Sequence, residues 1–243
     1  MIVNSLNEGW EVLYQRSHAN LAAMLVAGWR KRDHIPRWTE LLIATAQHDD
    51  QEMLWDQAQH LTELGAPVDF MEATLDTNRL NARFVIDNAY RQGVWIALLI
   101  SRHNSFLYEP MRGQDKQMDE FLDEQRDKQE VWRKLLGCSK TDLERAYSFL
   151  GWGDRLSLIL CRRELPGRGR YLDIAPGPDG EMIRVTQRDD ETISLDPWVL
   201  EEDEMTVSVE TRQLKQLKFE NEAEFGAVLD AAPIVLREWR FVR

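Results

Sequence analysis

The sequence contains few cysteines and no long apolar run. Its two cysteines, Cys138 and Cys161, cannot build a disulfide framework, and neither belongs to a CxxC pair of the kind that binds zinc. Such sparse cysteine is typical of a reducing compartment, and the first residues show neither a basic leader nor an apolar signal segment. No stretch reaches the roughly eighteen apolar residues that a membrane span needs. We therefore expect a cytoplasmic protein with no membrane partner.

Positive charge is also scarce. The chain has 30 Lys and Arg against 42 Asp and Glu, which gives a formal net charge of -12. Proteins that bind nucleic acids neutralise backbone phosphates with a surplus of Lys and Arg, and no basic stripe stands out here. We expect no nucleic-acid partner, whereas a small phosphorylated molecule is not excluded. The GxGxxG, GxxxxGK[ST] and GxSxG signatures of dinucleotide-binding, P-loop and serine-hydrolase proteins are missing as well.

Apolar residues at helical spacing fill most of the sequence up to about residue 165. The expected helices cover residues 7–31, 36–59, 75–93, 94–108, 115–136 and 139–161. Beyond a Pro- and Gly-rich stretch, "RRELPGRGRYLDIAPGPDGE", come alternating segments typical of strands, with one short helix in "ENEAEFGAVLDAA". The sequence predicts a mainly α fold, with a helical bundle over residues 1–165 and a small β-rich C-terminal subdomain over residues 166–243.

Four of these expected helices place an imidazole or a carboxylate in their apolar stripe, at His18, His48, His103 and Asp154. A single buried histidine is usually bonded to a backbone carbonyl. Burying a carboxylate such as Asp154, however, costs several kcal/mol unless a cation compensates. Convergence of His18, His48, Asp49 and Asp154 on a divalent metal ion would satisfy all four side chains, because imidazole and carboxylate are suitable ligands for Mn, Fe, Ni or Zn.

The order of these residues resembles the signature of the HD superfamily, whose members carry an early histidine, an adjacent His-Asp pair on the next helix and an aspartate on a later helix. The matching residues are His18 in "QRSHANLA", His48 and Asp49 in "ATAQHDDQ", and Asp154 in "GWGDRLSL". The resemblance covers residues 10–162. It implies an HD-domain-like helical bundle and, as in many members, a metal-dependent phosphohydrolase acting on a small phosphorylated substrate.

A narrower resemblance is to a family of HD-like proteins that is carried only as a domain of unknown function. It rests on the segments "SHANLAAMLVAGW", "AQHDDQEMLWD", "GAPVDF", "ALLISRHNSFL" and "GWGDRLSLILC". This similarity extends toward the β-rich tail and implies no particular chemistry.

The HD resemblance implies a mononuclear centre whose ligands are His18, His48, Asp49 and Asp154. Mn, Fe, Ni, Zn and Mg all stay open as the identity of the ion. In a phosphohydrolase the ion would polarise a phosphoryl oxygen and acidify a water molecule. Asp50 would then orient a ligand or act as the catalytic base; its alternative is a solvated helix residue.

His103 would bind phosphate, protonate the leaving group or bind a second ion; its alternative is a core histidine. Arg16, Arg102 and Arg155 each neighbour one of these histidines or aspartates in the sequence, and they would hold a substrate phosphate by charge-assisted hydrogen bonds. The alternative for each of the three is an ordinary surface arginine.

Two other functions stay open at this stage. HD-type iron-dependent oxygenases carry two further histidines between the pair and the final aspartate. Only His103 has a suitable position here, because His60 falls near an expected helix end. A catalytically silent HD-like binding or signalling module would keep the polar cluster without chemistry. A haem-oxygenase-like bundle is disfavoured by the adjacent His-Asp pair, and a homo-oligomer is left open.

Overall fold

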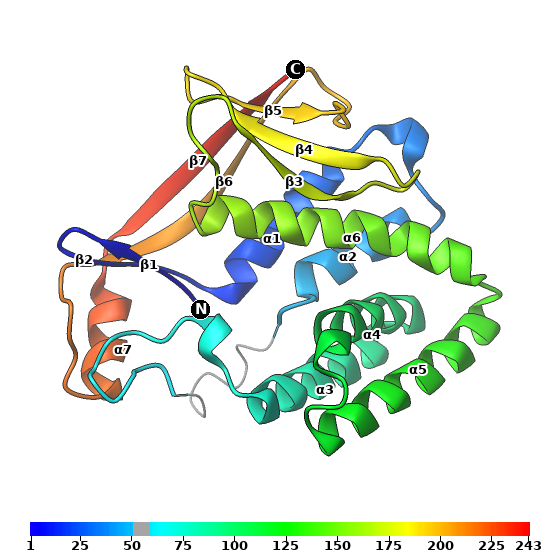
Figure 1. Ribbon diagram of the computed structural model, residues 1–243, viewed down its shortest axis with the longest axis horizontal. Coiled ribbons are helices and arrows are strands. Elements are labelled where there is room, and N and C mark those ends of the chain that lie inside the picture. The colour runs from blue at the N-terminus through cyan, green and yellow to red at the C-terminus, as the bar shows by residue number, and fades with distance from the viewer. Residues whose placement is uncertain (51–58) are drawn as a thin grey trace.

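The computed structural model describes residues 1–50 and 59–243 of the chain. Two helices, α1 (Gln15–Ala27) and α6 (Lys140–Cys161), lie between a mixed sheet and the other large helices (Figure 1). The remaining helices and strands are β1 (Ile2–Leu6), β2 (Gly9–Leu13), α2 (Trp38–Gln47), α3 (Leu75–Gln92), α4 (Val94–Tyr108), α5 (Lys116–Leu136), β3 (Tyr171–Pro176), β4 (Met182–Gln187), β5 (Ile193–Asp196), β6 (Glu204–Leu214), α7 (Glu222–Ala231) and β7 (Ile234–Val242).

The sheet has seven strands within the described residues, in the order β1-β2-β6-β7-β5-β4-β3. Neighbouring strands are antiparallel except β5 and β7, which are parallel. The N-terminal hairpin of β1 and β2 joins the sheet through β6, with Trp10 opposite Leu214. A side chain at Gly9 would overlap the carbonyl of Leu214, so glycine is needed where the hairpin meets β6. The sheet thus draws strands from both sides of the expected boundary at residue 165.

The expected mainly α fold, an HD-like helical bundle with a small β-rich extension, is wrong. A seven-stranded sheet forms a full layer of the molecule, and residues 9–13 form β2 instead of the beginning of a helix over residues 7–31 (Figure 1). The helical spacing of Trp10, Leu13 and Tyr14 misled the prediction, because so short a segment fits more than one period. Pairing with β6, which lies far away in the sequence, decides its conformation.

The later helices agree better with expectation. α3, α4, α5 and α6 lie within one or two residues of their expected ranges. α2 ends at Gln47, before the expected end near residue 59, and residues 51–58 of that expected helix lie outside the described residues. Among the helices that the structure describes, none is both long and apolar enough to cross a membrane.

Helices α1 and α6 approach each other closely beside Asp154. A Cβ atom at Gly153 would lie 2.6 Å from Cγ2 of Val26 and 3.0 Å from the carbonyl oxygen of Ala22, so the two helices can come this near only at a residue without a side chain. This contact sets Asp154 of α6 against the helix that carries His18.

Candidate metal centre

Five histidine and aspartate side chains gather where α1, α4, α6 and the end of α2 meet. They form two overlapping groups, one of His18, His48 and Asp49 and the other of His48, His103 and Asp154. Within each group, one nitrogen or oxygen atom per residue lies within 4.8 Å of the others. The four side chains that the sequence predicts as ligands therefore lie close together, and His103 joins them.

The His-Asp pair lies where the chain leaves α2. His48 is the residue that caps the helix, and its Nδ1 atom lies 2.7 Å from the carbonyl oxygen of Thr45. That carbonyl belongs to the last turn of α2, where backbone oxygens have no partner within the helix. A carbonyl oxygen only accepts hydrogen bonds, so Nδ1 of His48 carries a proton and donates it. The lone pair of a neutral His48 is then on Nε2, which lies 3.2 Å from Oδ1 of Asp154.

His18 is held in the same manner from α6. Its Nδ1 atom lies 3.0 Å from Oγ of Ser157, and the Ser157 hydroxyl donates its proton to the carbonyl oxygen of Asp154 at 2.8 Å. Because that hydroxyl proton is already engaged, Oγ of Ser157 accepts from Nδ1 of His18. The lone pair of a neutral His18 is therefore on Nε2, which lies 2.7 Å from Oδ2 of Asp49.

Both imidazoles thus direct an acceptor nitrogen at a carboxylate oxygen. Two acceptors at such distances repel each other unless a positive charge lies between them or one of them is protonated. A proton satisfies one nitrogen–oxygen pair at a time. A divalent cation satisfies several donor atoms together, and histidines that bind metals commonly donate their other N–H to a carbonyl or another acceptor, as His18 and His48 do.

In the metal-free protein the centre attracts a proton. Burial disfavours a charged imidazole, but the charge of Asp49 and the hydrogen bond to Asp154 outweigh it and raise the pKa of His48 to about 9. Burial disfavours ionised carboxylates too, yet the nearby histidines hold the pKa of Asp49 and of Asp154 below the usual range. At His103 burial prevails and lowers the pKa to about 4. The two aspartates therefore stay ionised around a site for positive charge.

Access to the cluster differs among its members. The side chains of His18 and His48 are fully buried, whereas 21% of the Asp49 side chain and 12% of the Asp154 side chain are exposed. His103 is buried, with its ring centroid 4.8 Å from that of His48. The side of the cluster that faces solvent is therefore the Asp49 side.

A family model described as "Protein of unknown function (DUF3891)" matches residues 1–216. The chain belongs to the DUF3891 family. No curated protein and no solved structure matches it. The match includes all five residues of the cluster and the sheet through β6, and it agrees with the expected similarity to a domain of unknown function. The matching family model does not itself place the chain in the HD superfamily.

In this DUF3891 protein, the predicted base and the three predicted phosphate-binding arginines are all engaged with charged partners. Arg16 pairs with Asp50, with Nε 3.0 Å from Oδ1, so this pair stands next to Asp49 in the chain. Arg102 is bonded to Glu144 by two hydrogen bonds, and Arg155 pairs with Glu164 at 3.3 Å. Of the three arginines, Arg16 stands beside the exposed side of the cluster. Their roles toward a substrate stay predictions.

Several contacts of the cluster escaped the sequence prediction. Ser157 lies three residues after Asp154 on α6, a spacing that places both on one helix face and could have drawn attention to it. Tyr147 contacts His103 from α6, with Oη 3.4 Å from Nδ1. Burial, aided by the charge of Asp49, raises the pKa of Tyr108. No spacing rule connects Tyr108 to Asp49, because Tyr108 ends α4 whereas Asp49 follows the end of α2.

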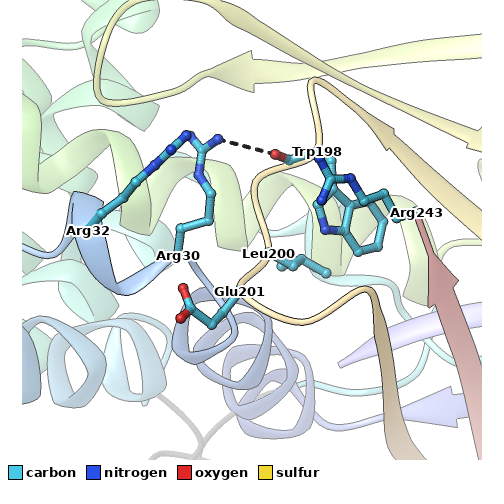
Figure 2. A pocket seen from close by; sticks show the side chains of 6 residues that line it. All are labelled: Arg30, Arg32, Trp198, Leu200, Glu201 and Arg243. Carbon is cyan, nitrogen blue, oxygen red and sulfur yellow. Dashed lines mark hydrogen bonds between the residues drawn. The ribbon is translucent and has the colours of Figure 1, made fainter.

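A separate cavity of about 350 Å³ lies beyond the end of α1 and is lined by Arg30, Arg32, Trp198, Leu200, Glu201 and Arg243 (Figure 2). Figure 2 shows Arg30 reaching the carbonyl oxygen of Trp198, a hydrogen bond of 3.3 Å. Asp33 pairs with Arg30 at 2.8 Å, and a second carboxylate pairs with Arg243 at 3.3 Å, so much of the positive charge is balanced. None of the five cluster residues lines this cavity.

Proposed function

We propose that the cluster binds one divalent transition-metal ion and that the protein is a metal-dependent phosphohydrolase of small phosphorylated molecules, related to the HD superfamily. The observation that carries the proposal is the orientation of His18 and His48. Each donates its Nδ1 proton to a fixed acceptor and directs Nε2 at an aspartate. This is the arrangement expected of imidazoles that ligate a cation.

The donor set favours certain ions. Three imidazoles and two carboxylates suit Mn, Fe, Ni or Zn, whereas Mg prefers oxygen ligands and retains several waters. The two groups of donors share His48, and only one nitrogen of His48 is available because the other donates to Thr45. A shared nitrogen serves one ion, so we propose a mononuclear centre.

The proposed reaction rests on the order of the ligands. A histidine on α1, a His-Asp pair after α2 and an aspartate on α6 follow the HD pattern, in which phosphohydrolases are common. A bound divalent ion would supply the positive charge that lets water attack a phosphoryl group. Asp50, one residue beyond Asp49, is the candidate base, and Arg16 is the cation placed to hold a phosphate at the exposed side of the centre.

The iron-dependent oxygenase remains the second candidate because His103 adds a third imidazole to the set. A dinuclear centre would need a further histidine. The chain has five histidines. Of the two outside the cluster, His60 bonds to Glu222 at 3.2 Å and His34 stacks on Trp38. Neither belongs to the two donor groups, so the observations favour the mononuclear phosphohydrolase.

We expect the protein, loaded with Mn, Fe, Ni or Zn, to hydrolyse at least one member of a panel of small phosphomonoesters and phosphodiesters, with release of phosphate from a monoester or of an alcohol from a diester. Replacing Asp50 by asparagine removes the base and should lower kcat by about 10²–10⁴-fold. The Glu130→Gln variant, altered on the far surface of α5, should retain full activity. Oxygen consumption without phosphoester hydrolysis would support the oxygenase instead, and an Asp50→Asn enzyme as active as the wild type would contradict the assigned base.

A further inference from the structure

Consecutive side-chain contacts lead outward from His103 across the interface of α4 and α6. The Nδ1 atom of His103 lies 3.4 Å from Oη of Tyr147. The guanidinium of Arg102 lies over the Tyr147 ring, 4.5 Å from its centroid. Glu144 binds that guanidinium by two hydrogen bonds, of 2.8 Å to Nε and 2.9 Å to Nη2. His103 and Arg102 belong to α4, and their two partners belong to α6.

These contacts restrain the phenol of Tyr147 from both sides. Tyr147 is only 7% exposed, and a bidentate Arg–carboxylate pair has a fixed geometry, so the cation over the ring cannot easily move away. Arg102 and Tyr147 also form a cation–π contact, which attracts the guanidinium to the face of the ring. The Tyr147 hydroxyl is thereby held 3.4 Å from Nδ1 of His103.

We propose that Tyr147 is a positioning residue that makes His103 the third imidazole ligand of the centre, and that the Arg102–Glu144 pair holds Tyr147 in place. The inference rests on the metal centre proposed above. In this assignment Tyr147 does for His103 what Thr45 does for His48 and Ser157 does for His18: its hydroxyl oxygen accepts the Nδ1 proton of His103, which leaves Nε2 for the ion. Such outer partners typically change metal affinity by 10–100-fold when they are removed.

The proposal assigns different roles to His103 and Arg102 from those that the sequence suggests. A histidine whose Nε2 binds the ion is not free to protonate a leaving group. An arginine whose guanidinium is bonded to Glu144 and stacked on Tyr147 has little donor capacity left for a substrate phosphate. Arg102 then acts on the centre only through Tyr147.

The test is a double-mutant cycle read by the binding of Co²⁺, whose visible absorption reports its ligands. We expect Tyr147→Phe, which removes only the hydroxyl, to weaken Co²⁺ binding by about 10–100-fold and to change the visible spectrum. In a His103→Gln background the same Tyr147→Phe change should have no further effect, because its target is gone. Tyr90→Phe on the surface of α3 is the matched control and should behave as the wild type.

A second variant distinguishes the proposed role of Tyr147 from a general effect on folding. Arg102→Gln leaves Tyr147 in place but removes its restraint, so it should weaken Co²⁺ binding in the same direction and by a smaller factor. Wild-type affinity and spectrum in Tyr147→Phe, or equal losses from Tyr147→Phe in both backgrounds, would overturn the role of Tyr147 while leaving the metal centre intact. Failure of the wild-type protein to bind Co²⁺ would overturn the metal centre itself, and the role of Tyr147 with it.

Discussion

The metal-free protein is expected to lose stability as the pH rises from 6.5 to 9. The pKa of His48 rises from its ordinary 6.5 to about 9 on folding, so the folded protein holds this proton more tightly than the unfolded chain. The resulting stabilisation is fully present below pH 6.5 and disappears as the pH passes through 9; its size is on the order of 3 kcal/mol. The contribution of His103 to stability has the opposite pH dependence, because its pKa falls to about 4. Stability should therefore also decline as the pH falls from 6.5 toward 4.

Binding of a metal ion should remove the loss of stability above pH 6.5. The ion needs the same Nε2 atom of His48 that otherwise holds the proton, so its affinity rises as that proton leaves. A free metal concentration one hundred times the Kd adds about 2.7 kcal/mol of stability. Urea denaturation at several pH values, with and without Mn²⁺ or Zn²⁺, measures both effects. His34→Ala should keep the slope and His48→Ala should abolish it, whereas a pH-independent free energy of unfolding in the metal-free wild type would contradict the prediction.

The second large effect is expected at Glu11, a carboxylate in β2 that is fully buried. Its oxygens accept two hydrogen bonds from Arg163, at 2.9 and 3.2 Å, one from Arg237 at 3.0 Å and one from Asn4 at 3.0 Å. Arg237 also donates to the carbonyl oxygens at the end of α6, so Glu11 ties the N-terminal hairpin to α6 and β7. Glu11→Ala leaves a largely buried guanidinium without its partner and should lower the free energy of unfolding by about 3–5 kcal/mol.

Two companion variants separate charge from packing at this position. Glu11→Gln keeps the size of the side chain and part of its hydrogen bonding, so it should cost less than Glu11→Ala. Replacing Glu11 and Arg237 together by leucine and methionine removes both charges and should recover much of the lost stability, as is common for buried pairs. Urea denaturation curves of the three variants give the comparison. A loss below about 1 kcal/mol in Glu11→Ala would show that the pair does not anchor the hairpin.

The long helices of the fold could be predicted from the sequence because their signals are local. The N-terminus of α6 has a capping box formed by Ser139 and Asp142, and α5 ends at Gly137 in the left-handed conformation. The strands from β4 onward also follow alternating segments. Such signals do not depend on distant partners.

The strands that escaped prediction depend on pairing with distant segments. The hairpin of β1 and β2 is short and joins the sheet through β6, so its own residues do not determine its structure. β3 lies within the Pro- and Gly-rich stretch and pairs only with β4 at the edge of the sheet. Of its six residues only Ile174 is buried, which leaves almost no alternating pattern to detect.

Part of the candidate centre could also be predicted, because the signals for that part are local. The positions of His18, His103 and Asp154 within apolar helical stripes are visible in the sequence, and each of the three is buried as expected. His48 is buried on the same side as Leu41 and Thr45, although it caps α2 and does not lie within a longer helix. The acceptors that fix the histidine tautomers, among them Ser157, depend on how the helices cross, and a single sequence does not contain that information.

The central claim is that the buried nitrogens and carboxylates surround one metal ion, and elemental analysis tests it most directly. We expect wild-type protein, purified without chelators, to contain about one ion of Mn, Fe, Ni or Zn per chain. The His48→Ala and Asp49→Ala variants should lose that ion and keep their helical circular dichroism, while His34→Ala should retain it. A wild-type protein that takes up none of these ions, or unchanged metal content in both cluster variants, would contradict the claim.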